Sequence, residues 1–297
     1  MVGRFAPSPT GPLHLGSLVA AVGSWLFARS TGRRWLVRME DLDTPRLVRG
    51  SAEEILDSLE KYGLWWDGRV ERQSERAALY EAALARLRGA GLAYDCGCSR
   101  AEVARSASAP VPGDESAGPV YGGTCRAGIA PGKAPRAVRF RVPPGRVSWD
   151  DLVLGSVTEE TSAAVGDFVL KRADGPFAYQ LAVVVDDAEQ GVTQVVRGAD
   201  LASSTARQLL LQGALGLATP EYGHLPLVLG PDGKKLGKRD GALPLETLDE
   251  RRLRETLRAA LSILGQEPAD GRPAEILDEA LARFDPGRIP TTPAALV

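Results

Sequence analysis

The sequence predicts an α/β fold, and three observations lead to this prediction. Residues 5–16 are rich in proline, glycine and hydroxyl side chains, and apolar residues then recur at helical spacing from Leu15 to Leu26. Residues 35–39 are typical of a strand, which ends in acidic side chains. Further helical patterns follow that strand. This alternation of loop, helix and strand is typical of nucleotide-binding α/β domains.

The rest of the chain continues the alternation. Helices are expected over residues 51–61, where Ser51 and the acids after it resemble a capping box, over 74–88 and over 205–215. The apolar run 179–187 fits either a helix or a strand. From residue 246 onward the pattern is helical. Strands are expected in four further segments: 137–142, 168–171, 193–198 and 226–230.

Length and composition limit the function classes. The chain has 297 residues, enough for two or three domains, and its 44% hydrophobic and 25% charged residues exclude a disordered or fibrous chain. The net charge of −2 means that a nucleic-acid partner would have to meet a local basic patch. No apolar run is long enough for a membrane span, and the N-terminus lacks the apolar core of a signal peptide, so we expect a cytoplasmic protein.

Two loops carry the pattern of a nucleotide site. In the first, residues 4–17, a helix N-terminus and His14 could contact phosphate, and Gly16 leaves room for a flat base. The second, residues 230–242, is basic and could close over a polyphosphate. Each loop also has a plain structural reading, as a proline-rich cap before a buried helix and as a solvated lysine-rich turn. The four cations of the second loop are Lys234, Lys235, Lys238 and Arg239.

Together these loops resemble the two signatures of class I aminoacyl-tRNA synthetases. Residues 14–17 (HLGS) match the HIGH signature, and residues 235–239 (KLGKR) match the KMSKS signature with Gly237 in place of the first serine. Three further segments resemble the glutamyl-tRNA synthetase family, and the likeness extends over residues 3–245. These segments are 4–11 (RFAPSPTG), 38–41 (RMED) and 195–200 (VVRGAD).

The resemblance implies a Rossmann-type class I synthetase catalytic core with a zinc-bearing insertion and a short helical C-terminal region. The expected division is listed by residue range: first half of the core 1–91, insertion 92–178, second half of the core with the KMSKS-like loop 179–242, and helical C-terminal region 243–297. Only 55 residues follow Ala242, which is too few for an anticodon-binding domain with its connecting helices.

The chain therefore resembles the shortened members of the family. These activate L-glutamate with ATP and transfer it to the queuosine base at the wobble position of tRNA(Asp), so the implied partner is the anticodon stem-loop of that tRNA. Two alternatives remain open. One is a compact ligase that charges tRNA(Glu) at its 3′ end, and the other is a non-catalytic tRNA-binding module. A generic nucleotidyltransferase is a weaker possibility.

The resemblance also assigns the glutamate site. It implies that Arg4 and Arg197 bind the side-chain carboxylate of glutamate, with Ser8 and Tyr179 as hydroxyl partners, and that Glu40 binds the α-ammonium group. From the residues alone, Glu40 and Arg197 could equally be polar strand ends. Asp186 and Asp187 also match the family and are assigned no role.

The implied chemistry is adenylate formation from glutamate and ATP with Mg²⁺. A carboxylate is already nucleophilic at neutral pH, so the protein has to supply alignment and charge stabilisation. The resemblance gives these catalytic roles to His14 and Lys238. It implies five ATP-binding residues: His14, Gly16, Ser17, Lys235 and Lys238.

The three cysteines resemble a zinc site. Cys96 and Cys98 are two residues apart, and Cys125 follows later. Zinc prefers four tetrahedral ligands, and from the residues alone the fourth could be Asp114 or water, or the cysteines could simply be reduced and free of metal. The family resemblance assigns the fourth position to Tyr121 and makes the zinc structural.

A run of cations between residues 126 and 149 contains no acid and is the best local candidate for contact with RNA phosphates. A solvated face is the alternative reading. The cations are Arg126, Lys133, Arg136, Arg139, Arg141 and Arg146.

Overall fold

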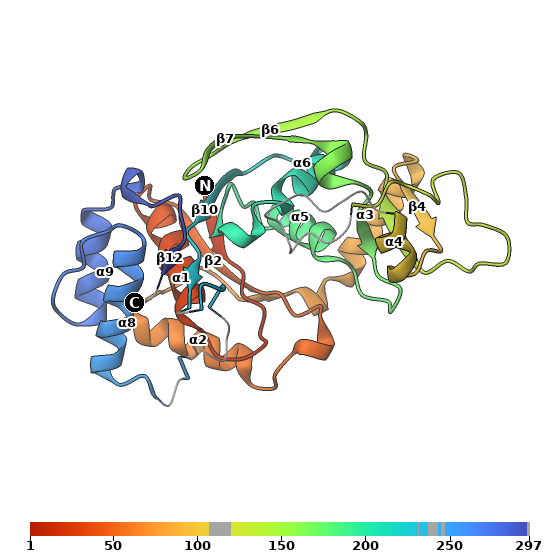
Figure 1. Cartoon of the computed structure of the whole chain (residues 1–297). Helices are drawn as coiled ribbons and strands as arrows, with labels where there is room; N and C mark the ends of the chain where they lie inside the picture. Colours follow the sequence, from red (N-terminus) through yellow and green to blue (C-terminus); the bar gives the residue numbers. More distant parts are fainter. Residues whose placement is uncertain (107–119, 231, 237–242, 245–246, 296–297) are drawn as a thin grey trace.

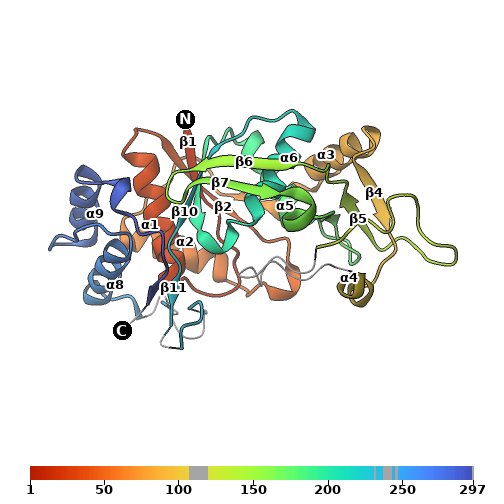
Figure 2. The ribbon, with the colours of Figure 1, turned by 45° about the horizontal axis from the view of Figure 1, so that its top comes forward.

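The computed structural model describes residues 1–106, 120–230, 232–236, 243–244 and 247–295. Its centre is a seven-stranded sheet in the order β3-β2-β1-β9-β10-β6-β7. All neighbours in it are parallel except β6 and β7, which form an antiparallel hairpin along one edge of the sheet (Figures 1 and 2). A mostly parallel sheet with helices on its faces confirms the predicted α/β class.

The strands of this sheet come from distant parts of the chain. They are β1 (Val2–Phe5), β2 (Arg34–Met39), β3 (Glu71–Arg72), β6 (Arg146–Asp151), β7 (Gly155–Glu160), β9 (Gln194–Gly198) and β10 (Glu221–Leu225). The β6–β7 hairpin lies in the segment expected to be the insertion, but it extends the central sheet. Residues of this segment therefore belong to the central sheet, where Asp151 at the end of β6 is buried.

A second, three-stranded sheet has the order β4-β5-β8. It lies at the end of the molecule opposite the C-terminal helices (Figure 1). Its strands are β4 (Ala93–Cys96), β5 (Ala137–Phe140) and β8 (Val169–Lys171), and the short helix α4 (Arg100–Ser106) follows β4. A third pair joins β11 (Val228–Leu229) to β12 (Ala294–Ala295), so the chain's last described residues return to the region of the second loop.

The helices are α1 (Leu15–Arg29), α2 (Ser51–Tyr62), α3 (Ala77–Gly89), α5 (Tyr179–Glu189), α6 (Ser204–Leu215), α8 (Glu250–Ile263) and α9 (Pro273–Ala282). Short helical turns occupy 44–46, 73–75, 161–165, 199–201 and 286–288. Helix α1 is buried along most of its length and packs between the sheet and α8. A second apolar core joins α3, α5 and α6 to the small sheet.

Most predicted elements are confirmed, and the undecided run at 179–187 is the helix α5. Two details were wrong. The N-cap of α2 is Gly50, in the left-handed conformation, and Ser51 makes no cap; its hydroxyl instead donates to the Gly11 carbonyl (2.7 Å) and accepts from the Gly11 N–H (3.0 Å). The strand expected over 226–230 shrinks to the two residues of β11. In the described residues, no helix is long and apolar enough to cross a membrane.

Candidate active site

One cavity brings together nearly all the residues expected to bind glutamate and ATP. It opens where β1, β2 and β9 end, the edge at which open parallel sheets bind ligands. Lys238 lies outside the described residues, as do Gly237 and Arg239. The predicted residues that line the cavity are Arg4, Ser8, His14, Gly16, Ser17, Glu40, Tyr179, Arg197 and Lys235.

Arg197 is held by neutral groups. It sits near the end of β9, 5% exposed, and its Nη1 donates to Gln208 Oε1 (2.9 Å) and to the Tyr179 hydroxyl (3.2 Å). Its Nη2 donates to Thr205 Oγ1 (2.9 Å) and its Nε to His224 Nε2 (3.1 Å). Within the described part of the chain, no carboxylate forms an ion pair with Arg197, and all four of these hydrogen-bond partners are uncharged. The guanidinium is therefore ready for an external anion.

Arg4 is paired inside the protein, unlike Arg197. Its Nε and Nη2 approach the Asp187 carboxylate at 3.4 and 3.5 Å, while Arg38 binds the same carboxylate more closely, at 2.8 Å. These two arginines hold the pKa of Asp187 below its usual range despite its burial. Arg4 therefore makes a loose pair that leaves donor capacity on the cavity side.

Glu40 lies just after β2, its side chain 10% exposed and 3.4 Å from the Arg38 guanidinium. Burial raises the pKa of Glu40, and the nearby carboxylates of Asp187 and Asp186 add to this, although Arg38 and Arg4 act in the opposite direction. A cation arriving from the cavity would stabilise the Glu40 carboxylate. Burial also raises the pKa of the Tyr179 hydroxyl, which keeps it a neutral hydrogen-bond partner.

The first loop ends by capping α1. His14 Nδ1 accepts from the Ser17 N–H (3.2 Å), and the His14 N–H donates to Ser17 Oγ (2.8 Å). A Cβ at Gly16 would lie 3.1 Å from the His14 ring, so glycine gives this ring room. The helix N-terminus faces the cavity, where its partial positive charge can stabilise a phosphate.

Only the first part of the second loop is described. Lys235 bridges to Leu229 as an antiparallel residue pair, and its ammonium group pairs with the Asp200 carboxylate. Both side chains are partly exposed and line the cavity. A salt bridge this exposed is worth little, so a phosphate could readily replace Asp200.

The site also contains residues that were given no role. Arg38 and Asp187 connect the glutamate end to Asp186, which is fully buried and accepts from Gln73, Arg76 and Tyr80. The acidic pair at 186–187 was visible in the sequence. The contacts of this pair could not be predicted from the sequence, because they depend on side chains from β1, β2 and α3 that come together only in the folded chain.

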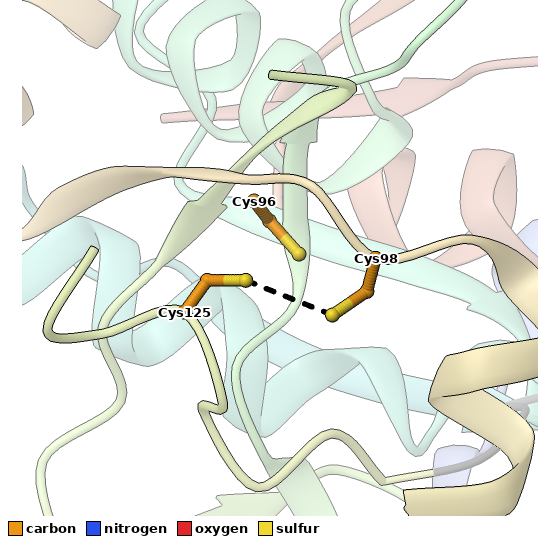
Figure 3. Close-up of side chains that lie close together, drawn as sticks. All are labelled: Cys96, Cys98 and Cys125. Atoms are coloured by element: carbon orange, nitrogen blue, oxygen red, sulfur yellow. Dashed lines mark hydrogen bonds between the residues drawn. The ribbon is translucent and has the colours of Figure 1, made fainter. Parts of the chain in front are cut away.

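The three cysteines form one cluster at the small sheet (Figure 3). Their Sγ atoms lie within 4.8 Å of one another, with Cys98 and Cys125 3.6 Å apart. A Zn–S bond of about 2.3 Å gives roughly 3.8 Å between ligands of a tetrahedral site, so this spacing fits zinc. The Tyr121 hydroxyl lies 3.5 Å from Cys96 Sγ and 3.4 Å from Cys98 Sγ and so completes a set of four donors. Asp114 lies outside the described residues.

The predicted basic patch is exposed in part: Arg136 and Arg146 are exposed, whereas Arg139 is buried. Contact of this segment with RNA stays a prediction, and several of its cations already have acidic partners. Arg126 pairs with the buried Asp167, and Lys133 and Arg146 pair with acids brought in from other segments. Arg139 is 9% exposed and lies over the Tyr121 ring at 4.1 Å. The absence of acids between residues 126 and 149 did not mean that these cations lack acidic partners, because Asp167, Glu102 and Glu160 come from outside that interval.

Known proteins resemble this chain along its whole length. The family model of class I tRNA synthetases (E and Q), catalytic domain, matches residues 1–290. The glutamyl-Q tRNA(Asp) synthetase of Geobacter sulfurreducens is 57% identical over 99% of this chain and 95% of its own, and that of Xanthomonas campestris is 51% identical over 97% and 93%. A glutamate tRNA ligase from Elizabethkingia meningosepticum, solved in complex with its amino acid, superposes with a TM-score of 0.80 and 28% identity, covering 100% of this chain and 67% of that one.

Proposed function

The chain belongs to the glutamyl-Q tRNA(Asp) synthetases, within the class I tRNA synthetases for glutamate and glutamine, and we propose that it is a ligase with that activity. It activates L-glutamate with ATP and transfers the glutamyl group to the queuosine base at the wobble position of tRNA(Asp). The observation that carries this proposal is Arg197, a buried cation without an acidic partner in the described structure, in one cavity with Glu40 and the capped helix α1.

Glutamate binding uses opposite charges at the two ends of the substrate. Arg197 binds the side-chain carboxylate, assisted by the Tyr179 hydroxyl, which is already its hydrogen-bond partner. Arg4 and Ser8 complete that end, and Glu40 binds the α-ammonium group. The α-carboxylate is then left to face the ATP end of the cavity.

Activation is an in-line displacement. An oxygen of the α-carboxylate attacks the α-phosphorus of ATP, the bond to the bridging oxygen breaks, and pyrophosphate leaves with its electrons. No proton has to be removed, so alignment and charge stabilisation account for the rate. His14, Gly16 and Ser17 at the start of α1 and Lys235 hold the phosphates, and Lys238 is proposed to stabilise charge on the departing pyrophosphate.

Transfer then consumes the adenylate. The acceptor group on the queuosine base attacks the glutamyl carbonyl carbon, the bond from that carbon to the phosphate oxygen breaks, AMP leaves with the bonding electrons, and the acceptor's proton passes to solvent. The partner is the anticodon stem-loop, whose unstacked wobble base can enter an open cleft. Because the substrates are ATP and a tRNA, we propose that the activity is cytoplasmic.

We also propose a structural zinc ion at Cys96, Cys98, Tyr121 and Cys125. The four donors lie on β4 and its following loop and on the segment before β5, so one ion would join these two segments through their side chains.

The test is transfer of labelled glutamate onto three purified RNAs: queuosine-bearing tRNA(Asp), tRNA(Asp) without queuosine, and tRNA(Glu). We expect label on the first alone. Label on tRNA(Glu) would instead identify a compact aminoacylating ligase. Absence of glutamate-dependent ATP–pyrophosphate exchange would refute the enzymatic proposal and favour a tRNA-binding module.

A further inference from the structure

A buried chain of hydrogen bonds connects the sheet-edge hairpin to Arg197. Asp151 ends β6, and its Oδ2 forms a short hydrogen bond with His224 Nδ1 at 2.5 Å. His224 lies on β10, where it pairs in register with Arg197 on β9. The other ring nitrogen, Nε2, accepts from Arg197 Nε at 3.1 Å. All three side chains are at least nine-tenths buried.

Asp151 is itself held in one orientation. Its Oδ1 accepts three backbone N–H groups, those of Val153 (3.0 Å), Leu154 (3.0 Å) and His224 (3.1 Å). This leaves Oδ2 as the acceptor for the His224 ring. Because a carboxylate can only accept, Nδ1 of His224 must carry the proton.

That proton fixes the role of the other nitrogen. A neutral imidazole protonated at Nδ1 has an unprotonated Nε2, which can accept from Arg197. A proton on Nε2 would set two donors against each other beside a guanidinium charge. Burial, with the nearby charge of Arg197, lowers the pKa of His224, which keeps the ring neutral.

We propose that Asp151 and His224 are positioning residues for glutamate binding: they set the tautomer that holds the Nε edge of Arg197, so that its remaining donor capacity faces the substrate carboxylate. This proposal rests on the proposed function, in which Arg197 binds that carboxylate. The β6–β7 hairpin would then contribute to substrate affinity, although Asp151 itself does not line the cavity.

The distinguishing variant is Asp151→Asn, which is nearly isosteric. The asparagine oxygen can still accept the three backbone N–H groups, but its NH2 group then faces His224 Nδ1 and forces the ring proton onto Nε2. We expect the KM for glutamate in ATP–pyrophosphate exchange to rise by about tenfold or more, with the KM for ATP within twofold of wild type. If Asp151 served core packing alone, the KM for glutamate would not rise while the KM for ATP stayed the same.

Two substitutions of His224 distinguish the role of its Nδ1 from the role of its Nε2. His224→Asn can keep the donor to Asp151 but loses the acceptor for Arg197, so we expect the same rise in glutamate KM. His224→Gln can present an amide oxygen near the former Nε2 position, and its rise should be several-fold smaller. Tyr222→Phe is the matched control, because it removes a buried hydrogen bond from Gln212 beside the same ring and leaves the chain to Arg197 intact.

The tautomer can be read without activity. The chain has only two histidines, His14 and His224, so ¹⁵N NMR can assign the ring nitrogens of each. We expect a neutral Nδ1–H ring for His224 in the wild type and an Nε2–H ring in Asp151→Asn. A charged or Nε2–H ring in the wild type, or a glutamate KM within twofold of wild type in both Asp151→Asn and His224→Asn, would overturn the proposal. A wild type without glutamate-dependent exchange would instead refute the proposed function, and the NMR result would still test the hydrogen-bond chain.

Discussion

Replacing Glu40 by glutamine removes the only charge proposed to bind the substrate ammonium group, while the side chain keeps its size. Two unit charges about 4 Å apart attract by roughly 4 kcal/mol at an effective dielectric constant of 20. The glutamine oxygen can still accept a hydrogen bond, so part of this is recovered, and we expect a loss of about 2–4 kcal/mol. The KM for glutamate should therefore rise by roughly 30- to 1,000-fold, because ~1.4 kcal/mol corresponds to a factor of ten.

We expect Glu40→Gln to lose activity without losing stability against unfolding. The pKa of Glu40 is raised by burial, so folding favours its protonated form, and ionisation costs stability as the pH rises above the ordinary glutamate range. Glutamine resembles that protonated form. Arg38 also keeps Asp187 at 2.8 Å and Gln190 at 2.6 Å. We therefore expect a Tm at pH 7 equal to or above that of the wild type.

The assay is ATP–pyrophosphate exchange with glutamate varied, over a series of pH values. Glutamate binding needs an ionised Glu40, so kcat/KM of the wild type should fall as the pH drops through the raised pKa. Glu40→Gln should lack this limb and keep only the titration of the substrate side chain, with a pKa of about 4.3. Glu279→Gln, which removes an exposed carboxylate on α9, is the control. A glutamate KM within threefold of wild type in Glu40→Gln would refute the assignment of the ammonium site.

Four further substitutions test other parts of the molecule. Lys235→Ala should raise the KM for ATP by about tenfold and leave that for glutamate unchanged, since one charge-assisted contact is lost; equal effects on both would contradict the assignment. Cys98→Ser should lower bound zinc from one per chain to well below one, measured by elemental analysis, with a lower Tm; a zinc-free wild type purified without chelator would exclude the site. Gly265→Ala should cost about 2–4 kcal/mol of unfolding free energy, because its φ is +69° and a Cβ would lie 2.1 Å from the Arg288 carbonyl oxygen. Gly213→Ala, at an open helical position, should instead stabilise by about 0.5–1 kcal/mol in the same denaturation experiment.

The sequence predicted those features that depend on local pattern. Helix α1 was visible because its apolar residues recur at helical spacing behind a loop, and β9 because its strand pattern ends at a glycine. The false capping box at Ser51 shows the limit. A hydroxyl before two acids satisfies the local pattern, but its actual partner is Gly11, which is 40 residues away in the chain.

Predictions from charge patterns were less reliable, because the partner of a charged side chain can come from a distant segment of the chain. The interval 126–149 contains no acid, yet Asp167 reaches Arg126 and also accepts from the Val142 N–H at 2.8 Å. The hydrogen bond of His224 to Arg197 depends on the fold in the same way. The position of His224, 27 residues after Arg197, has no local meaning until β9 and β10 pair in parallel and place the two side by side.

The balance of charge in the cavity explains why glutamate and not glutamine should be the substrate. Arg4 and Arg38 have acidic partners inside the protein, Asp187 and Glu40, and Asp186 beside Arg38 is also bound by Arg76. Arg197 differs from these arginines, since its hydrogen-bond partners among the described residues are all neutral. The substrate side chain must supply one negative charge to compensate it, and glutamine would leave the buried guanidinium uncompensated.

The uncompensated charge on Arg197 predicts a large preference for glutamate over glutamine, which can be measured. A site that binds a charged group rejects an analogue without it by far more than a hydrophobic pocket rejects a missing methylene group. We expect kcat/KM for glutamine in pyrophosphate exchange to be at least ~1,000-fold below that for glutamate, about 4 kcal/mol. Arg197→Met should reduce the activation of glutamate far more than that of glutamine and so narrow the ratio. If the wild type activated the two amino acids within tenfold of each other, the uncompensated charge on Arg197 could not be the basis of recognition.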